Sequence, residues 1–205
     1  MIVYAETNFI LELTLGQEQC TSCRQLVNWA QGRQLDLRLP AYAFYESRAA
    51  ILLKQEVRSK LKDAIDTQVE ELGRTVPFGE FMEAFAPARA TLSNITITET
   101  ALLEEIIGAL AACSSDIPLD RTAALDVTVF RDLRLIKGDA DLIIFSCIAA
   151  DLEKRFAAGD VAPSIFVTRN SRDFGRDAKG FLRKYACDVF TSYDAAVGRL
   201  RALLP

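Results

Sequence analysis

The sequence predicts an α/β protein: a three-layer α/β/α sandwich with a central parallel sheet and a helical insertion at about residues 55–115. Two observations support this prediction. Short apolar runs that fit strands alternate with longer runs of helical periodicity, which is typical of parallel sheets with crossover helices. The middle of the chain shows only helical periodicity. At 205 residues, with half of them hydrophobic, the chain is expected to form one domain over 1–205.

The first third of the chain contains two predicted strands, at 2–5 and at 35–40. Helical patterns cover 8–15 and 18–31, and Pro40 suits the first position of the next helix. That helix is expected from near 42 to 73, because apolar residues recur along it at steps of three or four, at Leu53, Val57, Leu61, Ile65, Val69 and Leu72. We expect this stripe to be buried, against either the helices at 78–112 or a second subunit.

The middle of the chain is predicted to continue with helices after Gly73 and Pro77. A second helix is expected around Phe78, Phe81, Met82 and Phe85. Thr96 and Glu99 have the spacing of a capping box, which predicts the start of a third helix that runs to Ala112.

The last third returns to alternation. We predict a helix at 120–132, an apolar helix at 138–156, a buried strand at 164–169, a short helix, and a strand at 187–192. Ser192 is expected to cap a terminal helix.

Composition removes several classes of chemistry. The chain has no histidine, which excludes imidazole acid–base catalysis and the usual zinc and Ser-His-Asp sites. Five cysteines without a recognisable secretion signal indicate reduced thiols, and Cys20 and Cys23 fit a helix core better than a redox or metal site. No apolar run reaches the roughly 18 residues needed to span a bilayer. We therefore expect a cytoplasmic protein with no membrane partner.

Carboxylates and an amide recur where predicted strands end and helices begin. Glu6 follows the first strand, Glu46 lies in the first turns of the long helix, and Asp139 and Asp141 open the apolar helix. Asn170 and Asp173 follow the strand at 164–169. Each has a structural alternative, since Glu6 could favour a helix N-terminus and Glu46 could be a solvated helix acid. Joint placement at one edge of a parallel sheet instead predicts a site for Mg²⁺ or Mn²⁺, which prefer oxygen ligands.

Four segments together resemble the PIN-domain family, which includes VapC-type toxins. They are "VYAETNFILEL", "YAFYESRAAIL", "GDADLIIFSCIA" and "IFVTRNSRDF", and the resemblance covers roughly 1–53 and 117–193. It implies a Mg²⁺- or Mn²⁺-dependent endoribonuclease that hydrolyses RNA phosphodiesters, leaving a 3′-hydroxyl and a 5′-phosphate. It further implies RNA as a partner and is compatible with an antitoxin protein; we also expect a homodimer.

The resemblance assigns roles to individual residues. Acidic-site positions fall on Glu6, Glu46, Asp141, Asn170 and Asp173, with Glu6, Asp141 and Asp173 as metal ligands and Asp139 as the alternative to Asp141. Substrate-binding positions fall on Thr7, Asn8, Arg169, Arg172 and Lys137. The last three lie at the rim, where cations would neutralise phosphates, although the basic run at 169–184 could equally be a solvated helix face.

Two departures from the family pattern lead to an alternative function. Glu6 stands where the family has an aspartate, which shifts the carboxylate by about 1.5 Å, and Asn170 stands where an aspartate is commoner. The alternative is a catalytically degenerate PIN-like module that serves in binding or assembly.

Overall fold

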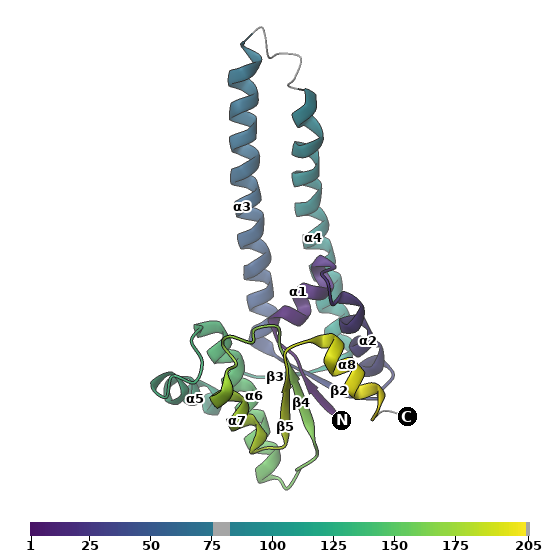
Figure 1. Cartoon of the computed structure of the whole chain (residues 1–205), viewed down its shortest axis with the longest axis vertical. Helices are drawn as coiled ribbons and strands as arrows, with labels where there is room; N and C mark the ends of the chain where they lie inside the picture. Colours follow the sequence, from purple (N-terminus) through teal and green to yellow (C-terminus); the bar gives the residue numbers. More distant parts are fainter. Residues whose placement is uncertain (76–82, 204–205) are drawn as a thin grey trace. The chain divides into compact units, whose positions relative to one another are not determined.

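Strands and helices alternate through most of the chain. The computed structural model describes residues 1–75 and 83–203 (Figure 1). In chain order the elements are β1 (Ile2–Tyr4), α1 (Thr7–Leu15), α2 (Cys20–Gln31), β2 (Asp36–Pro40), α3 (Ala41–Gly73), α4 (Ala86–Cys113), β3 (Ser114–Ile117), α5 (Arg121–Asp132), α6 (Asp139–Ala157), β4 (Ser164–Val167), α7 (Arg176–Arg183), β5 (Cys187–Phe190) and α8 (Tyr193–Arg201).

The five strands form one sheet in the order β3-β2-β1-β4-β5, and every pair is parallel. In this register Tyr4 of β1 lies opposite Arg38 of β2 and Phe166 of β4. All carboxyl ends therefore meet at one edge, where open parallel sheets usually place their ligands. The predicted α/β class and the parallel sheet are confirmed.

Helices flank both sides of the sheet. In Figure 1, α5, α6 and α7 lie on one side, and α1, α2 and α8 on the other. Aromatic rings pack the first group, since the ring centroids of Phe130 and Phe145 are 5.1 Å apart and those of Phe145 and Phe181 5.7 Å. On the second side Phe9 of α1 contacts Tyr193 of α8 at 5.5 Å.

A buried polar network fixes α6 beneath the first two strands. The hydroxyl of Tyr4 donates to Asp151 at 2.6 Å and accepts from Arg155 at 3.2 Å, while Arg38 pairs with Asp151 at 2.8 Å. Successive strand residues point to opposite faces. Tyr4 therefore points to the sheet face that α6 covers, and Asp141 at the start of α6 is close enough to Glu6, just after β1, for its charge to act on that carboxyl.

Most predicted elements on either side of the helical middle are present, with ends that differ from the predicted ones by at most two residues. The exception is β3, which was not predicted. Its sequence, "SSDI", is short and polar, and it pairs only with β2 at the sheet edge, where three of its four residues are not buried. The predicted role of Pro40 as the first helical residue was wrong, because Pro40 ends β2 and pairs with Ile117.

The chain divides into two compact units, Met1–Ser47 with Ile106–Pro205, and Arg48–Glu105. The second unit holds most of α3 and α4. Its described contacts between the two helices are largely polar: Arg58 pairs with Glu99, Arg89 with Asp66, and Gln55 donates to Thr100 at 2.7 Å. Ile51 and Leu103 are the buried hydrophobic residues among those described in this unit.

One prediction about the middle was wrong, and another is answered only in part. The stripe along α3 is not buried within one chain at Leu53, Val57 and Leu61, which are 63%, 61% and 51% exposed, and its burial against a second subunit stays a prediction. Thr96 does not start a helix, because α4 already begins at Ala86. The Thr96 hydroxyl donates to the backbone carbonyl of Leu92 one turn earlier, and Glu99 is engaged by Arg58, so neither side chain caps.

Part of the middle lies outside the described residues. The helix expected around Phe78, Phe81 and Met82 falls in 76–82, whereas Phe85 lies just before α4 and is exposed. Within the described ranges, none of the helices combines the length and the apolar character that crossing a membrane requires.

Candidate active site at the carboxyl edge of the sheet

Glu6 combines the two roles that the sequence left open. It is the N-cap of α1, and its carboxylate accepts from the backbone N–H of Asn8 at 2.8 Å and from Asn8 Nδ2 at 2.9 Å. It is also only 1% exposed, which is unusual for a capping acid. Glu6 therefore closes the turn between β1 and α1 while it holds a buried negative charge at the edge of the sheet.

Burial governs the protonation of Glu6. Loss of solvation raises the pKa of Glu6 from 4.5 to about 7, although hydrogen bonds from Asn8 and Thr168 oppose this effect. The negative charge of Asp141 raises the pKa further. The charge of an acid at the start of α6 thus acts on the acid that follows β1.

Asp141 lies in the first turn of α6 and reaches back over the helix start. Its Oδ2 accepts from Asn170 Nδ2 at 2.8 Å. Burial raises the pKa of Asp141 to about 6, and the charges of Asp173 and Glu46 act in the same direction. A Cβ atom at Gly138, the N-cap of α6, would lie 2.9 Å from this Oδ2, so glycine leaves the space that the carboxylate uses.

The structure separates Asp141 from Asp139. The side chain of Asp139 is 83% exposed and accepts from Arg131 of α5 at 2.9 Å. Asp141, two residues later, is rotated by about 200° around the helix axis, so it lies on nearly the opposite side and faces the loop after β4. Of the two candidates, Asp141 is the one that joins the other acids.

The remaining candidates also converge on this edge. Glu46, one turn into α3, accepts a short hydrogen bond from the hydroxyl of Thr7 in α1. Asn170 follows β4, and its Oδ1 accepts from the backbone N–H of Asp173 at 3.4 Å. We call Glu6, Glu46, Asp141, Asn170 and Asp173 the acidic edge.

The acidic edge offers the oxygen donors that Mg²⁺ and Mn²⁺ prefer, and burial raises the pKa of two of its acids, Glu6 and Asp141. The donor type therefore fits a divalent ion. The spacing is looser than that of a formed site: in the described part of the chain, no three Asp, Glu, Cys or His side chains are grouped closely enough to hold a metal. Instead, neutral donors from Thr7, Asn8 and Asn170 bind three of the acids.

Comparisons with family models, with curated proteins and with solved structures find no match for this chain. The acidic edge is therefore described from its geometry alone. Glu6 precedes α1, Glu46 lies in α3, Asp141 lies in α6 and Asp173 follows β4, and these segments begin at the carboxyl ends of β1, β2 and β4 or lie beside them.

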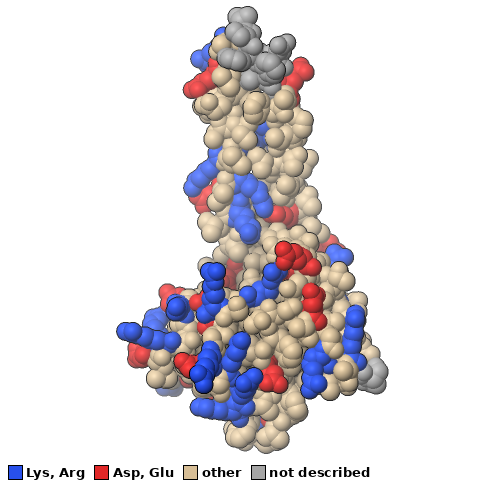
Figure 2. All heavy atoms as spheres, viewed as in Figure 1, with Lys and Arg blue, Asp and Glu red and all other residues tan. Residues whose placement is uncertain are grey.

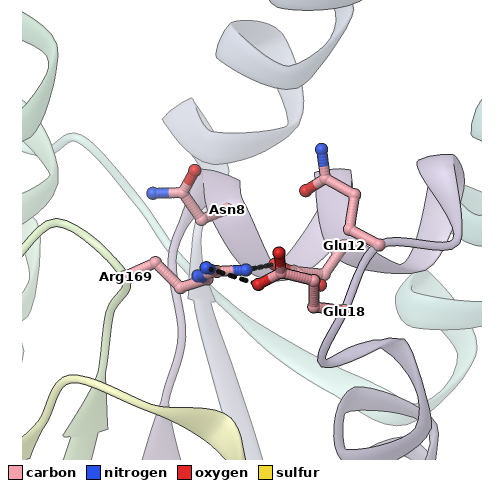
Figure 3. A pocket seen from close by; sticks show the side chains of 5 residues that line it. Asn8, Glu12, Glu18 and Arg169 are labelled. Carbon is pink, nitrogen blue, oxygen red and sulfur yellow. Dashed lines mark hydrogen bonds and ion pairs between the residues drawn. The ribbon is translucent and has the colours of Figure 1, made fainter.

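The predicted rim cations differ in their surroundings. Lys137 and Arg172 are exposed in the loops before α6 and after β4. Arg169 is engaged: its guanidinium pairs with Glu12 and, at 3.2 Å, with Glu18 (Figure 3). The predicted solvated face of the basic run is present in α7, which buries Ala178 and Leu182 while Arg176 and Arg183 are exposed.

Sequence reasoning missed Glu12 and Gly138. Glu12 of α1 is fully buried between apolar neighbours, and its spacing of four from Asn8 places both on one helix face. A lone acid inside the apolar run "FILELTL" was the available signal. By contrast, Cys20 and Cys23 are free and buried in α2, as predicted for core residues.

Proposed function

We propose that this chain is a divalent-metal-dependent endoribonuclease of the PIN type, with a three-layer α/β/α core and a helical insertion. The observation that carries the proposal is that Asn170 forms hydrogen bonds with Asp141 and Asp173 at the carboxyl edge of a parallel sheet, where the charge of Asp141 also acts on Glu6 and that of Glu46 on Asp141. Burial and neighbouring carboxylates raise the pKa of Glu6, which is buried, and of Asp141, which is half-buried. Such groups are costly for folding alone, and they concentrate at functional sites.

Glu6, Asp141 and Asp173 would hold one or two Mg²⁺ or Mn²⁺ ions, with Glu46 nearby. A bound ion would supply Lewis-acid activation of water for attack on the phosphodiester. The chain's own residues have other tasks. Thr7 and Asn8 hold Glu46 and Glu6 in place, and Asn170 orients Asp141 while its carbonyl oxygen accepts from the backbone of Asp173.

The substrate we propose is RNA, bound at the rim by Lys137, Arg172 and Arg169. A net charge of −4 does not oppose this, because phosphate binding depends on local charge. Figure 2 shows many Lys and Arg side chains on the visible face of the sheet-containing unit, with Asp and Glu side chains among them. A cytoplasmic location, an antitoxin partner and a homodimer belong to the same proposal.

A second candidate function is a catalytically degenerate module for binding or assembly. One observation favours it: three acids of the edge are bound by neutral donors, and the described carboxylates are too far apart to form a metal site. Glu6 in place of aspartate adds to this reading.

The deciding experiment is cleavage of a labelled single-stranded RNA with Mn²⁺. Asp141→Asn keeps the size of the side chain and removes its charge, so we expect cleavage to be lost. Asp139→Asn is the matched control, two residues away and exposed, and should cleave at the wild-type rate. Equal activity of the two variants would contradict the assignment of Asp141.

A thermal-shift measurement separates the two functions. If the edge binds metal, Mn²⁺ at 100 times its Kd stabilises wild type by about 2.7 kcal/mol and Asp141→Asn by much less. For the degenerate module, wild type is inert, and Glu6→Asp, which restores the family's usual residue, gains Mn²⁺-dependent cleavage.

A further inference from the structure

A cavity of about 410 Å³ lies directly beside the acidic edge. It is lined by Asn8, Glu12, Gln17, Glu18 and Arg169 (Figure 3). Asn8 links the cavity to the acidic edge, because its backbone N–H and its side-chain amide also donate hydrogen bonds to Glu6. The volume falls in the range of small-ligand sites, and all five of these lining residues carry polar or charged groups.

Arg169 is held in this cavity by two carboxylates in very different environments. Glu12 is 1% exposed and binds Nη1 of the guanidinium, while its other oxygen accepts from the backbone N–H of Gln19 at 3.0 Å. Glu18 is 83% exposed and binds Nη2 at 3.2 Å. Figure 3 shows both carboxylates meeting the same guanidinium.

The two ion pairs therefore differ in how readily they exchange. Separating Arg169 from Glu12 would leave a buried charge without a partner, which is strongly unfavourable. An exposed pair such as Arg169 with Glu18 contributes little and is screened by salt. Arg169 is thus fixed in place through Nη1 by Glu12, whereas another anion can compete with Glu18 for Nη2.

We propose that this cavity binds the phosphate of a nucleotide next to the one being cleaved, with Arg169 as its ligand and Glu18 as the carboxylate that the phosphate displaces. The inference rests on the proposed function and names its substrate contacts. Glu12 is a positioning residue, because it acts by holding Arg169. A phosphate oxygen suits the vacated Nη2, since guanidinium groups bind carboxylates and phosphates in the same geometry.

The polar lining supports a nucleotide as the occupant. The amides of Asn8 and Gln17 offer donors and acceptors for a sugar or base edge. Gly16 shapes this wall: it ends α1 with a φ of 58°, a conformation that glycine adopts without strain, and the chain turns there so that Gln17 and Glu18 face Arg169.

The test is binding of uridine 5′-monophosphate, compared with uridine, by titration calorimetry in EDTA. Glu18→Gln removes the competing charge, and we expect about 2- to 5-fold tighter binding of the monophosphate with no change for uridine. Asp188→Asn is the matched control, because it also neutralises an exposed acid paired with an arginine, Arg183 at 3.6 Å. It should leave both affinities unchanged.

A double variant tests the anchor. Glu12→Gln with Arg169→Gln removes the buried charge of Glu12 together with the charge of its partner, and monophosphate should then bind no tighter than uridine. If this variant does not fold, the comparison of Glu18→Gln with Asp188→Asn still decides. Equal effects of these two variants, or no binding of monophosphate to Glu18→Gln, would overturn the proposal.

Failure of this inference differs from failure of the nuclease. If the protein cleaves RNA but Glu18→Gln does not change monophosphate binding, the subsite proposal is wrong and the nuclease proposal still stands. If monophosphate binds through Arg169 but no Mn²⁺-dependent cleavage occurs, the cavity is a nucleotide site and the nuclease proposal is wrong.

Discussion

Asn170 joins the loop after β4 to the first turn of α6 by donating from Nδ2 to Oδ2 of Asp141 at 2.8 Å. The orientation of its amide is set on both sides, because Oδ1 accepts from the backbone N–H of Asp173 at 3.4 Å. A neutral side chain thus lies between two acids, and the charge of Asp173 raises the pKa of Asp141. This arrangement stabilises the acidic edge when no cation is present.

Asn170→Asp tests that role. The variant replaces the donor with a second carboxylate beside Asp141, so in EDTA we expect a loss of about 1–3 kcal/mol in the free energy of unfolding. Mn²⁺ affinity should rise, because the edge gains a negative charge. Urea unfolding with and without Mn²⁺ measures both effects. An Asn170→Asp variant as stable as wild type in EDTA would show that the hydrogen bond is unimportant.

Gly138→Ala tests the space that Asp141 occupies. The backbone of Gly138, with φ −80° and ψ 133°, accepts alanine, but the new Cβ would lie 2.9 Å from Asp141 Oδ2. We expect the carboxylate to rotate away, so that Mn²⁺ stabilisation falls several-fold while stability in EDTA changes by less than about 1 kcal/mol.

Gly175→Ala is the control for this substitution. Gly175 is also a helix N-cap, of α7, and its Cβ position is open within 4 Å. Its response to Mn²⁺ should match wild type. If both variants respond alike, crowding at Asp141 is not the cause.

Stability in EDTA should depend on pH through Glu6. Its pKa rises from 4.5 to about 7 on folding, so the folded state binds more protons than the unfolded state between these values. The free energy of unfolding should therefore fall as pH rises from about 4.5 to 7 and level off above, by on the order of 3 kcal/mol from Glu6. The raised pKa of Asp141, about 6, adds a fall in the same direction.

Glu6→Gln removes the largest part of this slope, because an amide does not titrate and still accepts one hydrogen bond from Asn8. Urea unfolding at pH 5 and pH 8 should then give closer values than in wild type. A slope unchanged in Glu6→Gln would show that another group is responsible.

The exposed row on α3 predicts self-association. Leu53, Val57 and Leu61 recur at steps of four and are each more than half exposed, and contiguous apolar surface of this kind usually marks an interface. With α4 already paired to the polar side of α3, a second copy is the partner that we expect, its two helices completing a four-helix bundle.

Leu53→Gln with Val57→Gln should convert a dimer to a monomer in sedimentation velocity without lowering the stability of the monomer by more than about 0.5 kcal/mol. Ile51→Ala, at a neighbouring buried position, should instead cost about 2–5 kcal/mol. A wild-type protein that sediments as a monomer at all concentrations would contradict this prediction.

Periodicity alone was enough to predict the parallel α/β class and the ends of most elements. Strands such as β1 and β4 are buried on both faces, so they read as continuous apolar runs between turn residues. The same reasoning failed where tertiary contacts compete with local pattern. In "SSDI" a polar edge strand has no apolar signal, and at Thr96 and Glu99 a capping pattern lies inside α4.

The chain by itself determined which residues stand at strand ends and helix starts, and therefore which acids could meet. Only the tertiary structure decided how they meet: Asp141 and not Asp139 faces Asn170, and Arg169 is bound by the buried Glu12. The physical reason is that local pattern specifies backbone direction over a few residues. Burial, hydrogen-bond partners and the resulting pKa values depend on side chains brought together from distant segments.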